Sequence, residues 1–121
     1  MFRINIKNLL TLFVLLFSSS VFAGDDLIGT SWTIKDSDGD MIILNFKKNN
    51  KCTWTPLKSY SGEEGYTSSK CKWVQNENIL SYNTNNNYNI GIAIINGNFM
   101  KGSFVTIYGE GYHGTLSGTR N

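Results

Sequence analysis

Hydrophobic and polar residues alternate along most of the chain after residue 23, in short segments separated by clusters of glycine, asparagine, aspartate and serine. Alternation with a period of two is typical of a strand with one buried face. Eight such segments lie near 30–35, 41–47, 51–57, 69–75, 79–83, 87–95, 99–108 and 112–120. Short connections such as Asn96-Gly97 make each strand antiparallel to the preceding one. The pattern predicts an all-β domain over residues 24–121, an eight-stranded antiparallel up-and-down (meander) barrel.

The phase of the alternation predicts which side chains face the barrel interior. The inner set comprises Trp32, Ile34, Ile42, Leu44, Phe46, Cys52, Trp54, Cys71, Trp73, Ile90, Ile92, Ile94, Met100, Gly102, Phe104, Tyr112, Gly114, Leu116 and Gly118. Glycines on the inner face of the last strands indicate tight curvature or close packing. Because three tryptophans, two phenylalanines and several isoleucines belong to this set, we expect side chains to fill the interior.

The amino terminus has the pattern of a signal peptide. Arg3 and Lys7 form a positive segment, Leu9–Phe17 is almost wholly apolar, and Val21 and Ala23 fit the cleavage site of a signal peptidase. The apolar run is too short for a bilayer core, which needs about 20 residues. We therefore expect cleavage near Ala23 and a soluble protein exported to the periplasm or secreted.

Removal of residues 1–23 changes the charge balance. The full chain has 11 Lys and Arg against 9 Asp and Glu, but Arg3 and Lys7 leave with the signal peptide. The mature chain is then formally neutral, and its charges are dispersed. It lacks the basic surface of a nucleic-acid-binding protein and the polybasic run that binds anionic membranes.

Cys52 and Cys71 both lie in the exported part, where disulfides form. A bond between them would close a ring of about 20 residues, which contributes on the order of 3 kcal/mol in the chain-entropy model. The alternative is a catalytic or metal-binding thiol. The sequence has no Cys-X-X-Cys spacing and a single histidine, so a structural disulfide is the favoured interpretation.

The sequence contains no recognisable catalytic constellation. His113 is the only histidine, and its parity on the last strand points outward. No nucleophile turn accompanies it, and adjacent Glu63 and Glu64 in a glycine-flanked loop are typical of a solvated tip. We expect no catalytic residues, no cofactor and no enzymatic activity.

Asp36, Asp38 and Asp40 follow the spacing at the start of a calcium-binding loop. Met41 stands where that loop needs glycine, and Lys47 stands where it needs a bidentate glutamate. A hairpin turn with solvated carboxylates is the better interpretation, and no metal site is predicted.

Two short motifs carry a resemblance to a known family. Leu27-Ile28-Gly29-Thr30-Ser31-Trp32 opens the first strand, and Gly118-Thr119-Arg120 ends the last. With the strand pattern, they resemble calycin-type barrels: lipocalins, avidins and small exported bacterial lipocalin-like or inhibitor domains. The resemblance implies that Arg120 packs over Trp32 and closes the barrel base, a favourable cation–π contact. The chain has one residue more than the family's Gly-X-Trp motif.

The longest loop, 58–68, is the predicted partner-binding surface, through Tyr60, Glu63, Glu64 and Tyr66. Tyrosines among glycines and serines are typical of adaptable binding loops, although a long hairpin connection is an equal alternative. The asparagine-rich stretch 83–89 could present amides to a sugar or peptide, and a turn that needs left-handed backbone is the simpler account.

Two functions remain open. The favoured one is an exported, non-enzymatic interaction module that binds or inhibits another macromolecule through loops at the barrel mouth. The alternative is a lipocalin-like carrier that holds a small apolar ligand inside the barrel. An eight-stranded barrel has room for either side chains or one small ligand. The bulk predicted on the inner face favours the first.

Overall fold

The computed structural model describes residues 26–58, 66–107 and 111–121. These residues form eight strands: β1 (Ser31–Asp36), β2 (Met41–Phe46), β3 (Cys52–Lys58), β4 (Cys71–Asn76), β5 (Ile79–Thr84), β6 (Asn89–Asn96), β7 (Phe99–Thr106) and β8 (Tyr112–Arg120). All eight predicted strands are present, with ends within two residues of the predicted bounds. The all-β prediction is confirmed.

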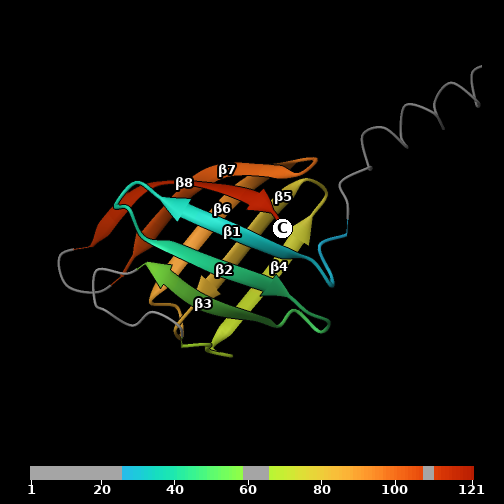
Figure 1. Ribbon diagram of the computed structural model, residues 1–121, viewed down its shortest axis with the longest axis horizontal. Helices are drawn as coiled ribbons and strands as arrows, with labels where there is room; N and C mark the ends of the chain where they lie inside the picture. Colours follow the sequence, from blue (N-terminus) through green and yellow to red (C-terminus); the bar gives the residue numbers. More distant parts are fainter. Residues whose placement is uncertain (1–25, 59–65, 108–110) are drawn as a thin grey trace, which may run out of the picture.

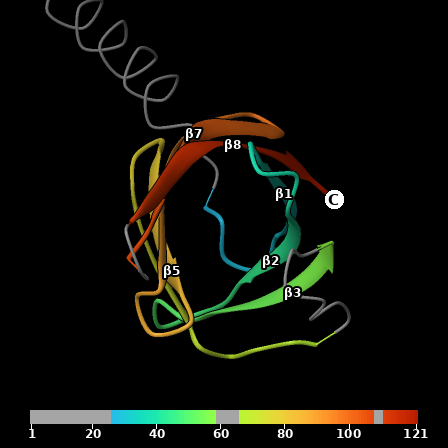
Figure 2. The same ribbon diagram turned by 90° about the vertical axis from the view of Figure 1, so that its left-hand side faces the viewer.

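The strands form one antiparallel sheet in the order β3-β2-β1-β8-β7-β6-β5-β4. Because β1 pairs with β8, the sheet closes around the chain ends and curls into a nearly closed barrel (Figures 1 and 2). The two edge strands, β3 and β4, form no ladder with each other; in the described residues their backbone pairing consists of two isolated bridges, Lys51 with Lys72 and Trp54 with Ser68. This is the up-and-down architecture that the resemblance to calycin-type barrels implied.

Asparagine-rich turns connect several of the strands. Asn49 and Asn50 join β2 to β3 with φ near 60°, and the segment 85–87 joins β5 to β6 with three consecutive positive φ values. Asparagine tolerates the left-handed region better than most residues. The simpler interpretation of the asparagine-rich stretch, a left-handed turn, is therefore confirmed.

The end of the barrel where β1 begins is packed with apolar side chains. The segment 26–30, blue in Figure 2, crosses this end, and its Leu27 is fully buried. The backbone carbonyl of Leu27 accepts hydrogen bonds from both the N–H and the hydroxyl of Thr30. The buried core below it contains Trp32, Leu44, Phe46, Trp73, Leu80, Ile95 and Met100. This end of the barrel is closed.

The predicted inner face of β6 is wrong. Gly91, Ala93 and Ile95 point inward, whereas Ile92 and Ile94 are 55% and 58% exposed on the outside. The ring of Tyr82 on β5 lies over Gly91, so closely that a Cβ there would approach its Cζ to 2.4 Å. Large side chains cannot share that space, and the isoleucines take the outer face.

The inner glycines of β7 and β8 allow close packing, as predicted. A Cβ on Gly102 would lie 1.8 Å from the carbonyl oxygen of Ile92 in the neighbouring strand. A Cβ on Gly118 would meet Met100 at 2.5 Å and Ile34 at 2.7 Å. Because Gly102 has no side chain, β7 approaches β6 more closely than it could with any larger residue at this position.

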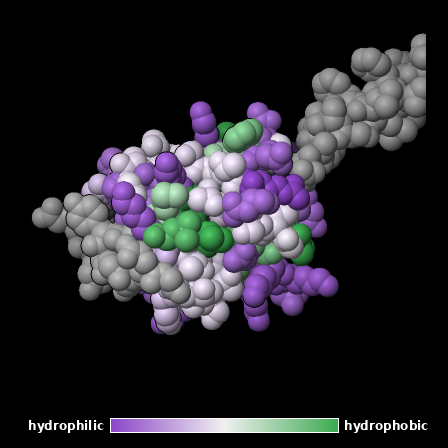
Figure 3. Space-filling model, viewed as in Figure 1, coloured by the Kyte–Doolittle hydropathy of each residue, from purple (hydrophilic) through white to green (hydrophobic). Residues whose placement is uncertain are grey.

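The face formed by β1, β2, β3 and β8 carries a hydrophobic cluster near its middle and smaller hydrophobic patches at its upper and right-hand edges, among hydrophilic and intermediate residues (Figure 3). The predicted signal peptide, residues 1–23, lies outside the described residues. Within the described part of the chain, no helix is long and apolar enough to cross a membrane.

Candidate functional site

The barrel contains a cavity of about 1070 Å³ at the end opposite Leu27. Ile34, Trp54, Phe104 and Leu116 form an apolar part of its wall, and polar residues from the strand ends and turns form the rest. The expectation that side chains fill the interior is wrong for this end. The rings of Tyr82 and Phe104 lie over the inward glycines Gly91 and Gly114, and the space beyond these rings stays open.

Three carboxylates lie together at the mouth of the cavity. Ligand oxygens of Asp36, Asp38 and Asp40 are all within 4.8 Å of one another. The carboxylate of Asp36 accepts hydrogen bonds from the backbone N–H of Asp38 at 3.0 Å and of Asp40 at 3.1 Å. Burial raises the pKa of Asp36 above its ordinary value, and the neighbouring negative charges of Asp40 and Asp38 raise it further. The turn concentrates negative charge at the entrance.

Two largely buried side chains that carry hydroxyl groups border the cavity. Tyr82 is 5% exposed and Thr84 is 2% exposed, and both line the cavity wall. Among the described residues neither side chain has a hydrogen-bond partner. Burial, and secondly the negative charge of Asp36, raises the pKa of Tyr82 well above its usual range. The Tyr82 hydroxyl therefore stays neutral and can donate or accept a hydrogen bond.

The indole of Trp54 differs from the two other tryptophans. Nε1 of Trp32 donates to the Thr30 hydroxyl at 2.9 Å, and Nε1 of Trp73 donates to the Lys51 carbonyl at 2.6 Å. Nε1 of Trp54 is buried beside the cavity with no partner among the described residues. A buried unpaired N–H is destabilising by about 1–3 kcal/mol. Such groups are rare in native proteins and are often found at functional sites.

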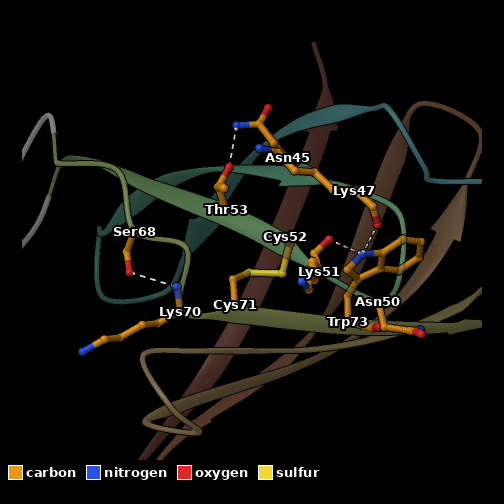
Figure 4. Close-up of a disulfide and its surroundings, with 10 residues drawn as sticks. All are labelled: Asn45, Lys47, Asn50, Lys51, Cys52, Thr53, Ser68, Lys70, Cys71 and Trp73. Carbon is orange, nitrogen blue, oxygen red and sulfur yellow. Dashed lines mark hydrogen bonds between the residues drawn. A yellow bond between two sulfur atoms is a disulfide. The ribbon is translucent and has the colours of Figure 1, made fainter.

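The predicted disulfide between Cys52 and Cys71 is present, with the two Cα atoms 4.9 Å apart. It joins β3 to β4 at the seam of the barrel (Figure 4). Beside it, the Trp73 indole is held by the backbone carbonyls of Lys47 and Lys51. The disulfide thus fixes the two strands that the sheet connects only through isolated bridges.

Trp32 and Arg120 are direct cross-strand partners between β1 and β8, as the resemblance implied. Trp32 is fully buried and Arg120 is half-buried. The packing of the guanidinium over the indole stays a prediction.

The predicted binding loop is only partly described. Tyr66 is 66% exposed. Tyr60, Glu63 and Glu64 lie outside the described residues. Lys58, at the start of this loop, lines the cavity. His113 is exposed on β8, on the outward face that its parity predicted.

Sequence reasoning missed the cavity residues Tyr82 and Thr84. The sequence feature that lies next to them is the asparagine-rich stretch 83–89, which the sequence marked as a possible source of amides for a ligand and whose Asn85 and Asn89 line the cavity. Alternation along β5 places Tyr82 and Thr84 on one face, but nothing in the sequence indicates that the space before them is empty.

No protein-family model matches the sequence, and no curated protein matches it significantly. Among solved structures, the chain is similar to the ligand-free form of intact afifavidin, at 16% identity and a TM-score of 0.47, over 86% of this chain and 88% of that one. It is also similar to rhizavidin in complex with biotin, at 11% identity and a TM-score of 0.45, over 80% of this chain and 97% of that one. A likeness of this extent concerns the fold, and no ligand follows from it for this chain.

Proposed function

We propose that this protein binds a small molecule in the cavity at the open end of the barrel, without transforming it. The observation that supports this function most directly is the cavity of about 1070 Å³ in a barrel whose other end is closed. Ligand sites in proteins commonly have volumes of about 300–1000 Å³ and combine apolar walls with a few polar groups. The cavity has that size and that composition.

The binding role agrees with the distribution of reactive groups. Both cysteines are bonded to each other, and His113 lies outside the barrel, away from the cavity. The described lining residues include no cysteine and no histidine. Recognition by shape, hydrogen bonds and charge is the chemistry these residues support.

The interaction-module hypothesis depends on the loop 58–68. Of its predicted contact residues, Tyr66 is exposed, and Tyr60, Glu63 and Glu64 lie outside the described residues. The small-ligand hypothesis depends only on described residues, and we therefore prefer it.

We also propose that the protein acts after export. The disulfide between Cys52 and Cys71 suits an oxidising compartment, and the pattern of residues 1–23 is that of a signal peptide. Intact mass measurement of protein from the periplasm or medium tests this, since cleavage after Ala23 gives a chain beginning at Gly24. An intact amino terminus on the recovered protein would contradict it.

Native mass spectrometry tests the function. The mature protein is recovered from its own compartment, and its native and denatured masses are compared. An excess of a few hundred daltons that is lost on denaturation supports a bound small molecule. A bare monomer that also binds none of a set of small molecules in solution contradicts the proposal and directs the search to a macromolecular partner.

Two variants on one strand provide a matched control. Leu116 is buried on the inner face of β8 and lines the cavity, whereas the adjacent Thr115 is exposed on the outer face. Leu116→Trp should reduce the bound fraction because the indole occupies the cavity. Thr115→Trp adds the same side chain outside and should leave the bound fraction unchanged. Equal effects of both variants would contradict binding inside the barrel.

A further inference from the structure

We propose that the ligand of this cavity is an organic cation, a protonated amine on an apolar or aromatic body, with its charge facing Asp36. This inference rests on the proposed small-molecule function and specifies the class of ligand. Asp36, Tyr82 and Thr84 supply the polar contacts, and the aromatic residues of the wall contact the body of the ligand.

The charges of the lining residues are predominantly negative. Asp36, Asp38 and Asp40 all line the cavity, and Lys58 is the one cation among its described lining residues. A cleft with low-dielectric walls concentrates the field of such charges. A cation entering the barrel therefore gains electrostatic energy along its path, and an anion is repelled.

The carboxylate of Asp36 is the best placed of the three to meet a ligand. It ends β1 at the cavity, and no Lys, Arg or His of the described residues pairs with it. Asp36 and Tyr82 both line the cavity, so a ligand there can reach the carboxylate and the hydroxyl together. A partly desolvated carboxylate without a positive partner is compensated when a cation binds.

The hydroxyls of Tyr82 and Thr84 provide hydrogen-bond acceptors inside the cavity. Both side chains are more than nine-tenths buried, border the cavity, and lack a described partner. A protonated amine carries up to three N–H donors, one for a carboxylate and two for neutral oxygens. The arrangement thus matches an ammonium group with N–H bonds better than a neutral or anionic ligand.

Aromatic rings surround the same space. The cavity is lined by five aromatic residues: Trp54, Tyr82, Tyr88, Phe104 and Tyr112. The ring centroids of Phe104 and Tyr112 are 6.2 Å apart. The face of an aromatic ring attracts a cation, and its carbon atoms pack against an apolar body. A metal ion would use the carboxylates alone, and the aromatic wall would then have no role. The wall favours an organic cation.

Calorimetry with three probes of similar shape tests the charge of the ligand: phenethylammonium, phenethyl alcohol and phenylpropionate. We expect phenethylammonium to bind at least tenfold more tightly than the alcohol, because a hydrogen bond to a charged group contributes more than a neutral one. Phenylpropionate should bind most weakly. Equal affinity for the ammonium and the alcohol, or tighter binding of phenylpropionate, would overturn the inference.

Asp36→Asn tests the residue, because the amide keeps an oxygen to accept the backbone hydrogen bonds and removes the charge. We expect it to weaken phenethylammonium binding about tenfold or more and to leave the alcohol unchanged. The matched control is Glu77→Gln, which removes a charge from the β4–β5 turn at the closed end. It should change neither affinity. An unchanged affinity of Asp36→Asn for phenethylammonium would refute the role of this carboxylate.

Two further outcomes separate this inference from the proposed function. If none of the probes binds but native mass spectrometry finds a bound molecule that is neutral or anionic, the charge inference fails and the small-ligand function stands. If neither experiment finds a ligand, both fail. A titration with Ca²⁺ is included, and calcium binding that excludes phenethylammonium would show that the carboxylates form a metal site instead.

Discussion

Cys52 and Cys71 join the two strands that hydrogen bonding leaves almost unpaired, with their Cα atoms 4.9 Å apart. Every other neighbouring pair of strands forms an antiparallel ladder, with one register shift in the β2–β3 pair at Met41 and Ile42. At the seam, the backbone pairing within the described residues consists of the isolated bridges Lys51–Lys72 and Trp54–Ser68. The covalent bond therefore holds the two strands together where no ladder of hydrogen bonds does. Its Cys52 belongs to β3, the strand that also carries Trp54 of the cavity wall.

Reduction of the disulfide should lower the free energy of unfolding by on the order of 3 kcal/mol, the value expected for a ring of this length. The double variant Cys52→Ala with Cys71→Ala should behave similarly. Urea unfolding with and without reductant measures the change. Identical midpoints would show that the bond does not hold the seam.

Trp32→Ala should lower the free energy of unfolding by about 3–5 kcal/mol, because the indole is fully buried in the closed end of the barrel. Tyr66→Ala, at a side chain that is 66% exposed, is the control and should change stability little. Chemical denaturation of both variants gives the comparison. A loss below about 1 kcal/mol for Trp32→Ala would contradict its place in the core.

Trp54→Phe should change stability by less than about 1 kcal/mol, because removal of the unpaired buried N–H offsets the loss of ring volume. Trp73→Phe makes the same chemical change but breaks bonds to the carbonyls of Lys47 and Lys51. It should cost about 2 kcal/mol or more. Equal decreases in the free energy of unfolding for the two variants would mean that Nε1 of Trp54 has a hydrogen-bond partner in solution.

Gly102→Ala should destabilise the protein by more than about 2 kcal/mol, since the added Cβ meets the backbone of β6 rather than a movable side chain. Ser103→Ala is the neighbouring control on the exposed face of β7 and should be nearly neutral. Thermal or urea unfolding distinguishes the two. A tolerated Gly102→Ala would refute the close approach of β6 and β7.

Ionisation of Asp36 should lower stability as the pH rises. Its pKa in the folded state is raised above the ordinary value of 3.8, mainly by burial, with Asp40 and Asp38 adding to the effect. The folded state then holds its proton more tightly than the unfolded state, so this contribution favours folding at low pH. It is lost progressively as the pH rises from below 3.8 through the folded pKa.

Asp36→Asn lacks this titration. The stability of the variant relative to the native protein should therefore increase across that window and become constant above it. Urea unfolding of both proteins at a series of values from roughly pH 3 to 7 measures the difference. A relative stability of the variant that decreases with rising pH would indicate a depressed pKa and contradict the burial of Asp36.

Much of the fold follows from local patterns. Period-two alternation located all eight strands, and residues such as Asn49, Asn50 and Gly97 marked the turns through their left-handed backbone. The meander followed from the short connections, and the pairing of β1 with β8 placed Trp32 beside Arg120. These features depend on neighbours in sequence or on simple closure, so sequence reasoning reaches them.

The face of β6 and the cavity depended on the tertiary structure. Alternation shows that Ile92 and Ile94 share a face, but it does not show which face is inside. That choice depends on Tyr82, which lies over Gly91 from the next strand, and on Gly102, which lets β7 approach. A cavity of about 1070 Å³ remains at the open end of the barrel, and Asp36, Tyr82 and Thr84 line it. The sequence by itself determined the strands and their order. The volume left between them depends on packing across strands distant in sequence, which only the folded chain decides.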